Sequence, residues 1–205
     1  MSIEVWISFI AAALVLCFSP GPTAFLVMGQ ALEHGRKSVL PLVAGTLSGD
    51  IIAMSFSFIG MGAVLATSAT LFLILKWVGA LYLIFLGIKA FRTKIELHIE
   101  PKQNDIKNGS VYLNALLVTA LNPKGIMFFM AFFPMFINND EPILPQMFVL
   151  AVSFLGASAT SVSFYALCSG FLRSKVSAVN FQNMFNKVSG GMLISAGVIT
   201  TTIQR

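Results

Sequence analysis

Charged residues are scarce in this sequence. Of its 205 residues, 10% are Asp, Glu, Lys or Arg and 57% are hydrophobic, and the mean hydropathy is +0.86. A soluble globular domain carries roughly a quarter charged residues and a smaller apolar fraction. The composition therefore excludes an ordinary soluble domain and predicts an integral membrane protein.

The excess of positive charge is small, and it does not indicate a nucleic-acid partner. The formal net charge is +5, from 13 Lys and Arg against 8 Asp and Glu. Most of the basic residues lie in short segments between apolar runs, where such residues orient a chain in the bilayer. The lipid bilayer, and not nucleic acid, is the expected surrounding of this chain.

Cysteine and histidine are also scarce, with two of each. Cys17 and Cys168 lie inside apolar segments, and the sequence contains no CxxC motif and no Cys/His cluster of the kind that binds a metal. No metal and no cofactor is therefore predicted, and the two cysteines are interpreted as buried thiols.

The N-terminus lacks the features of a cleaved signal peptide. It carries Glu4 and no basic segment, and the bulky Leu16 before Cys17 does not suit processing at small residues. The first apolar run is therefore expected to stay as a helix.

Long apolar runs make up most of the chain. A helix that crosses the hydrocarbon core needs about 20 mainly apolar residues, and six stretches reach this length. They cover residues 3–32, 39–66, 71–91, 111–137, 143–172 and 188–203. The connections are short, so residues 1–205 are expected to form a single six-helix membrane domain.

Basic residues fall on alternate connections between these spans. The first, third and fifth connections carry them: Arg36 and Lys37; Arg92, Lys94, Lys102 and Lys107; Arg173, Lys175 and Lys187. The second connection has none, and the fourth is acidic. Since cytoplasmic loops carry the excess of Lys and Arg, both termini are predicted to face outward.

Prolines interrupt two of the six spans near their middle. The two breaks read Ser19-Pro20-Gly21-Pro22 and Asn122-Pro123-Lys124-Gly125. Proline removes a backbone donor and kinks a helix, and in lipid each freed carbonyl needs a partner in protein or in a water-filled cavity. The half-helix amides can hold a substrate carboxylate and the freed carbonyls its ammonium, whereas a packing kink is the simpler alternative.

The order of residues in the two halves indicates an internal repeat. Placing Pro20 on Pro123 sets Ser19 against Asn122, and the third and sixth spans share a pattern at residues 76–80 and 187–191. Three spans followed by three spans insert in opposite directions. We therefore expect two inverted repeats, as in secondary transporters: about residues 1–91 and 111–205, joined by a polar cytoplasmic loop at about 92–110.

Two charged residues lie at the depth of the breaks. At about 1.5 Å per residue, Pro20, Asp50, Pro123 and Lys124 all lie roughly 16 to 20 Å from the cytoplasmic ends of their spans. A charge in the hydrocarbon core costs at least ~2.5 to 3.5 kcal/mol on insertion scales, so both charges are expected to face a cavity or each other. Asp50 and Lys124 are predicted to pair or to share a water network; Lys124 either binds a substrate carboxylate or neutralises Asp50.

The motifs and their order resemble the lysine-exporter family, in particular its homoserine/threonine-efflux branch. They are the Ser-Pro-Gly-Pro break, Glu33-His34-Gly35-Arg36, the segment from Gly45 to Asp50, the segment from Leu75 to Gly87, and Asn122-Pro123-Lys124. The chain departs from the family's pattern at Met135, where a polar residue is expected. The resemblance covers the whole chain and implies an exporter of amino acids or their derivatives in the bacterial inner (cell) membrane, driven by proton antiport.

The leading hypothesis is therefore a secondary exporter of a small zwitterionic solute and not an enzyme, with protons as the coupling ion. Asp50 is assigned to proton coupling, because a carboxyl in a partly dry site can bind and release protons near neutral pH. The candidate site residues are Ser19, Pro20, Gly21, Pro22, Asp50, Asn122, Pro123 and Lys124.

Three other functions stay open at this point. A thiol–disulfide enzyme needs two thiols that meet, and the repeat mate of Cys17 is Ala120. An uncoupled facilitator would have the same polar groups as an exporter, and a non-transporting scaffold has no use for costly buried charge. Small-residue faces, such as that of Gly45 and Gly49, are compatible with helix packing and with a homodimer.

Overall fold

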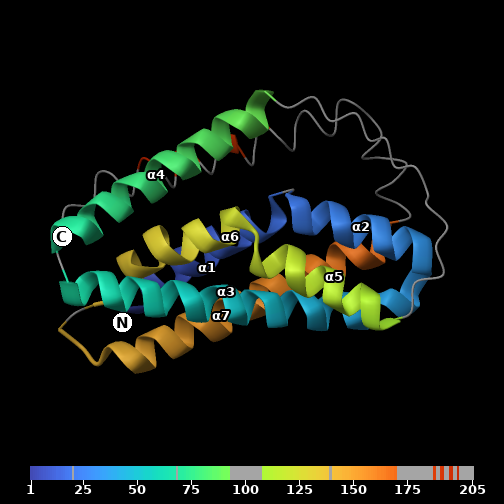
Figure 1. Cartoon of the computed structure of the whole chain (residues 1–205), viewed down its shortest axis with the longest axis horizontal. Coiled ribbons are helices and arrows are strands. Elements are labelled where there is room, and N and C mark those ends of the chain that lie inside the picture. Colours follow the sequence, from blue (N-terminus) through green and yellow to red (C-terminus); the bar gives the residue numbers. More distant parts are fainter. Residues whose placement is uncertain are drawn as a thin grey trace.

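The computed structural model describes residues 1–19, 21–67, 69–92, 108–138 and 140–169, together with residues 187, 190, 191, 194, 195 and 198. These residues are helical or lie in short connections, with no strand among them (Figure 1). The elements are α1 (Ile3–Phe18), α2 (Pro22–His34), η1 (Gly35–Ser38), α3 (Val39–Thr67), α4 (Ala69–Arg92), α5 (Asn108–Ala120), α6 (Pro123–Met127), η2 (Phe128–Phe132), η3 (Phe133–Phe136) and α7 (Ile143–Leu167).

Two of the described helices are long and apolar enough to cross a membrane unaided. They are Val39–Gly60 within α3, and α7. The number rises to four if each bent pair is one span: α1 with α2, bent by 56°, and Ser110–Ala120 with Pro123–Phe136, bent by 42°. The prediction of an all-helical membrane chain is confirmed, whereas most of the sixth expected span and most of the polar loop lie outside the described residues.

The first break follows from local backbone preferences. Ser19 and Gly21 are extended, and Pro22 occupies the first turn of α2, where its missing N–H costs little. Pro20 lies outside the described residues. The sequence thus ends α1 and starts α2 within a few residues.

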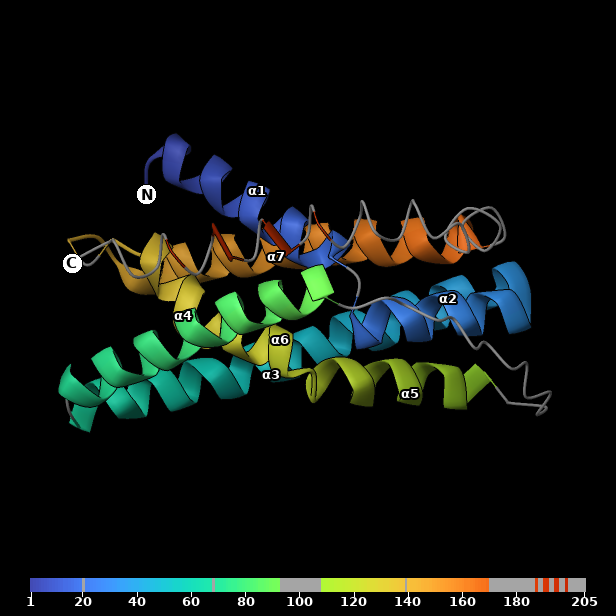
Figure 2. The ribbon, with the colours of Figure 1, turned by 90° about the horizontal axis from the view of Figure 1, so that it is seen from above.

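The second break follows from the same backbone preferences, with an N-cap residue in addition. Asn122 is the N-cap of α6: its Oδ1 accepts a hydrogen bond from the Lys124 backbone N–H at 3.1 Å, and Pro123 takes the first helical position. Asparagine is among the residues most favoured at this position because it satisfies an unpaired amide. Both breaks lie near the middle of the length of the bundle, and the two bent spans run in opposite directions (Figure 2).

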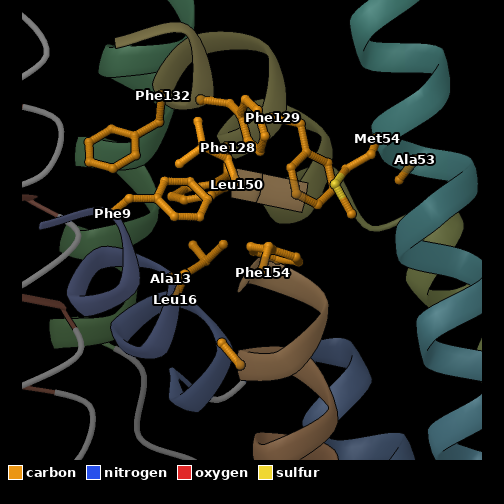
Figure 3. Packing of buried hydrophobic residues seen from close by; sticks show 12 residues of the cluster. Phe9, Ala13, Leu16, Ala53, Met54, Phe128, Phe129, Phe132, Leu150 and Phe154 are labelled. Carbon is orange, nitrogen blue, oxygen red and sulfur yellow. The ribbon is translucent and has the colours of Figure 1, made fainter. Parts of the chain in front are cut away.

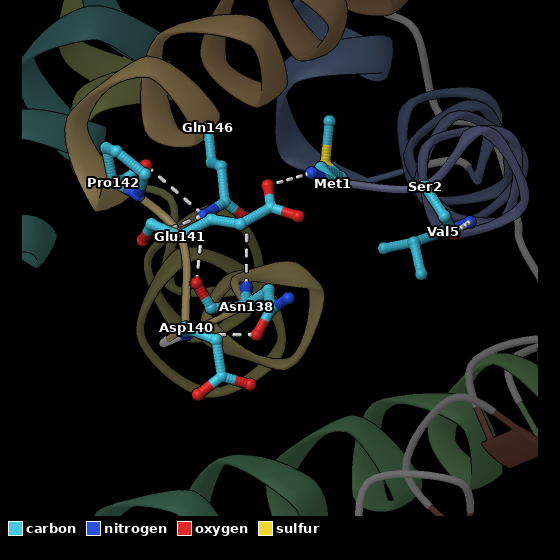
Figure 4. A network of polar contacts seen from close by, with 8 residues as sticks. All are labelled: Met1, Ser2, Val5, Asn138, Asp140, Glu141, Pro142 and Gln146. Atoms are coloured by element: carbon cyan, nitrogen blue, oxygen red, sulfur yellow. Dashed lines mark hydrogen bonds and ion pairs between the residues drawn. The ribbon is translucent and has the colours of Figure 1, made fainter.

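The N-terminus is fixed to the connection between η3 and α7. The Met1 ammonium pairs with the Glu141 carboxylate, and buried Gln146 exchanges two hydrogen bonds of 2.9 Å with the backbone of Asn138 (Figure 4). This polar network joins the start of the first bent span to the end of the second. The connection between α2 and α3 lies at the opposite end of the bundle (Figure 1).

Phenylalanines fill the half of the bundle next to that network. Phe9, Phe128, Phe129 and Phe154 are almost completely buried and gather in one cluster (Figure 3). Phe133 belongs to the same cluster, and its ring centroid lies 5.4 Å from that of Phe9. Edge-to-face and offset contacts of this kind add to the packing energy.

The aromatic cluster includes a local change of helix type. The Phe133 amide donates to the carbonyl of Phe128 and so closes a π-type turn in η2, and Pro134 follows in the first turn of η3. Because Pro134 has no N–H to donate, the regular helical ladder cannot continue through it. Four phenylalanines of this segment, at positions 128, 129, 132 and 133, pack with residues of α1 and α7 in the cluster.

Glycines let α3 approach α5 closely. A Cβ on Gly49 would lie 2.7 Å from the Leu116 carbonyl oxygen and 2.8 Å from the Thr119 Cβ, and Gly45 makes a similar approach to Ala115. Small residues commonly mark such helix contacts in membranes. The face of Gly45 and Gly49 is therefore used within one chain and is not available to a second copy.

Gly49→Ala is expected to destabilise the protein by about 1–3 kcal/mol, because the new methyl group forces α3 away from α5. The matched control is Gly60→Ala on the same helix, since a Cβ there meets nothing within 4 Å, and alanine favours helix more than glycine. Thermal unfolding of the two detergent-purified variants tests this. A Gly49→Ala variant as stable as Gly60→Ala would contradict the close-packing account.

Candidate functional site

A cavity of about 70 Å³ lies between the two breaks. The breaks contribute Ser19, Gly21, Asn122 and Lys124, α3 contributes Thr46 and Asp50, and α7 contributes Ser158, Ser161 and Tyr165. These polar groups share the lining with members of the two apolar clusters, such as Leu16 and Val27. The cavity thus gathers polar groups from five helices at the level of the breaks.

Three consecutive carbonyls at the end of α1 have side-chain partners from other spans. Ser161 Oγ donates to the Cys17 carbonyl at 2.8 Å, and Tyr165 Oη donates to the Phe18 carbonyl at 2.6 Å. Lys124 Nζ donates to the Ser19 carbonyl at 2.7 Å. The break frees these carbonyl groups from the helical hydrogen-bond pattern, and lipid offers them no donor. Side chains of α7 and α6 supply the missing hydrogen bonds.

Lys124 joins one break to the other. Its backbone belongs to the first turn of α6, whereas its ammonium lies at the end of α1, where the helix dipole is negative and favours a cation. A Cβ placed on Gly21 would be 3.7 Å from Nζ, an ordinary van der Waals contact, so Gly21 lies directly beside the lysine. The small residue in the first break and the lysine of the second therefore belong to one arrangement.

A second set of polar contacts links α2 to the start of α6. Asn122 Nδ2 donates to Thr23 Oγ1 at 3.3 Å, and Thr23 Oγ1 lies 3.5 Å from Thr119 Oγ1 of α5. The amide group of Asn122 therefore caps α6 with its oxygen and contacts α2 with its nitrogen.

Asp50 lies near the middle of α3 and is 6% exposed. Ser158 Oγ of α7 donates to its Oδ2 at 2.5 Å. Among the described residues the ion pair is that of Met1 with Glu141, so Asp50 and Lys124 line the same cavity without a direct bond. A carboxylate and an ammonium thus face one cavity with capacity for further hydrogen bonds.

The structure brings most of the predicted site residues together. Asp50, Lys124, Ser19, Gly21 and Asn122 line the cavity. Pro22 and Pro123 start the helices beside it and do not line it, and Pro20 is outside the described residues. The direct Asp50–Lys124 pair, one of the two predicted arrangements, does not form.

Sequence reasoning missed the contribution of α7. Ser158, Ser161 and Tyr165 follow one another at spacings of three and four residues, which places them on one face of a helix, and all three are buried. The signal that could have found them is this polar stripe within an otherwise apolar span. Thr46, one turn before Asp50 on α3, was also missed, and its polar side chain in an apolar span is the same kind of signal.

A family model described as LysE type translocator matches residues 14–202. The chain belongs to this family. Membership indicates a membrane transporter rather than an enzyme, and it confirms the resemblance drawn from the motifs. No solved structure matches the chain.

Individual relatives extend over the whole chain. It is 29% identical to an uncharacterized membrane protein of Vibrio cholerae over 98% of both chains, and 28% identical to a homoserine/homoserine lactone efflux protein of Salmonella typhimurium over 97% of both. A Bacillus subtilis membrane protein is 27% identical over 95% of this chain and 97% of its own length. The chain is a multi-pass protein of the bacterial inner (cell) membrane.

Tyr165→Phe is expected to destabilise the protein by about 0.6–2 kcal/mol, because it leaves the Phe18 carbonyl without its partner in a place of low water content. Thermal unfolding in detergent measures the effect. Thr160→Ala is the control, since the exposed Thr160 hydroxyl on the same helix bonds only within that helix, to the Gly156 carbonyl. Equal stability of the two variants would show that the freed carbonyl needs no side-chain donor.

Proposed function

We propose that this protein exports small zwitterionic amino acids or amino-acid derivatives out of the cell, in exchange for protons, by alternating access around the cavity between the breaks. The observation that carries the proposal is that Asp50 and Lys124 line one cavity and do not pair with each other. Unpaired charges in the membrane interior are costly. A zwitterion offers an ammonium to Asp50 and a carboxylate to Lys124.

The polar contacts support this division of roles. The carbonyls of Cys17, Phe18 and Ser19 already accept side-chain hydrogen bonds, so they are poorer partners for a substrate ammonium than Asp50. Lys124 uses one of its three donors on Ser19 and has two left for a carboxylate. Of the two roles that the sequence left open for Lys124, substrate binding is therefore the one we propose.

Proton coupling follows from competition at Asp50. A protonated carboxyl has no charge with which to hold an ammonium, so proton and substrate exclude one another. Ser158 holds the carboxyl toward the cavity. Alternate binding of a proton from outside and a substrate from inside yields antiport.

The arrangement of the spans supports alternating access. The two bent spans run in opposite directions (Figure 2), as two inverted three-helix repeats with spans one and four broken at prolines require. The basic link at Arg36 and Lys37 lies at the end of the bundle away from the N-terminus (Figure 1). By the positive-inside rule this orientation has the N-terminus outside, and six spans return the C-terminus to the same side.

Homoserine is the substrate of first choice for a test, because relatives of this chain are named for its efflux. In everted membrane vesicles with an acidic interior, the wild-type protein is expected to concentrate labelled homoserine and to lose the accumulated label when a protonophore is added. Asp50→Asn is expected to abolish concentrative uptake at unchanged membrane abundance, because the amide neither carries the charge nor takes up the proton.

The matched control is Asp140→Asn, which alters an exposed acidic residue in the link before α7 and is expected to leave uptake unchanged. Concentrative uptake by Asp50→Asn would remove Asp50 from the coupling mechanism. Uptake by the wild-type protein that only equilibrates, with or without the pH gradient, would favour the uncoupled facilitator.

The thiol–disulfide alternative has little support. Cys17 and Cys168 are free thiols; Cys17 lines the cavity, whereas Cys168 packs against the apolar cluster around Val162 and Ala166. A homodimer stays a prediction.

A further inference from the structure

Thr46 differs from the other hydroxyl residues of the cavity. It lies on α3, one turn before Asp50, is 2% exposed and lines the cavity. Its Oγ1 atom is completely buried and has no hydrogen-bond partner. In contrast, the hydroxyls of Ser158, Ser161 and Tyr165 donate to protein acceptors.

The missing bond is unusual for a hydroxyl on a helix. Serine and threonine in helices commonly bond back to the carbonyl four residues earlier. In this protein Ser55, Ser153 and Thr160 do so at 2.7 to 2.8 Å. Thr46 makes no such bond, although its side chain borders the cavity.

Leaving a buried hydroxyl without a partner is unfavourable, and a ligand atom that bonds it removes this penalty. The position of Thr46 relative to Asp50 indicates which ligand atom makes this bond. Thr46 and Asp50 are four residues apart on one face of α3, with a rise of about 6 Å between them. A substrate whose ammonium is held by Asp50 can extend a short side chain along α3 to Thr46.

We propose that Thr46 Oγ1 hydrogen-bonds the side-chain hydroxyl of the substrate, and that the site thereby selects short hydroxylated amino acids over aliphatic amino acids of the same size. This inference rests on the proposed function, because it uses the ammonium position at Asp50. The cavity volume of about 70 Å³ is that of a few water molecules, which restricts the substrate to a small side chain.

The test compares homoserine with norvaline, in which a methyl group replaces the hydroxyl. In everted vesicles the wild-type protein is expected to prefer homoserine by about tenfold, judged by competition against labelled homoserine, since a site that bonds a hydroxyl rejects the analogue that lacks it. Thr46→Val keeps the shape and removes the hydroxyl. It is expected to bring the ratio close to one while norvaline is still transported.

Ser57→Ala is the matched control. Ser57 is also a buried hydroxyl without a partner on α3, but it does not line the cavity, so its loss is expected to leave the ratio unchanged. If Thr46→Val does not accumulate in the membrane, the pair Thr46→Ser and Thr46→Ala, which differ by the hydroxyl alone, gives the same comparison.

Two outcomes overturn the inference at different levels. A wild-type protein that concentrates neither compound contradicts the proposed function and this inference with it. A wild-type protein that prefers homoserine, with the ratio unchanged in Thr46→Val or in Thr46→Ala, contradicts the inference alone.

Discussion

The hydrogen bond from Lys124 to the Ser19 carbonyl is the contact on which the rest of the site depends. A helix that stops in the middle of a membrane frees carbonyls that lipid cannot satisfy. In this protein a lysine from the other broken span, together with Ser161 and Tyr165 of α7, supplies the donors. The two breaks and α7 are thereby held together, and a polar cavity forms where hydrocarbon would otherwise be packed.

The consequence is an electrostatic division of the cavity. Lys124 is occupied at the end of α1, and Asp50 is held by Ser158 on α3, so the opposite charges do not cancel. The aromatic cluster of Phe9, Phe128 and Phe133 fills the half of the bundle toward the N-terminus. In the proposed mechanism, a solute in this cavity is separated from that end by close-packed rings, so its release there requires these rings to move.

The sequence was most informative where covalent geometry limits the backbone. Proline and glycine at residues 20–22 and 122–125 predicted both breaks, and counting residues placed Asp50 and Lys124 at the same depth. It was least informative about contacts between distant segments: Tyr165 reaching the Phe18 carbonyl, and Ser158 reaching Asp50, depend on how α7 packs. A direct Asp50–Lys124 pair was a reasonable expectation from depth alone, but depth does not fix the partner, and a backbone carbonyl and a serine compete for those charges.

The measurement that tests the central claim most directly is the binding of charge-altered substrate analogues to the purified wild-type protein by isothermal titration calorimetry. The zwitterion homoserine is compared with its amide, which lacks the carboxylate, and its N-acetyl derivative, which lacks the ammonium. If Asp50 and Lys124 each hold one end, both analogues bind at least about tenfold more weakly than homoserine. Equal affinity of all three compounds would contradict the account that these two unpaired charges form the binding site.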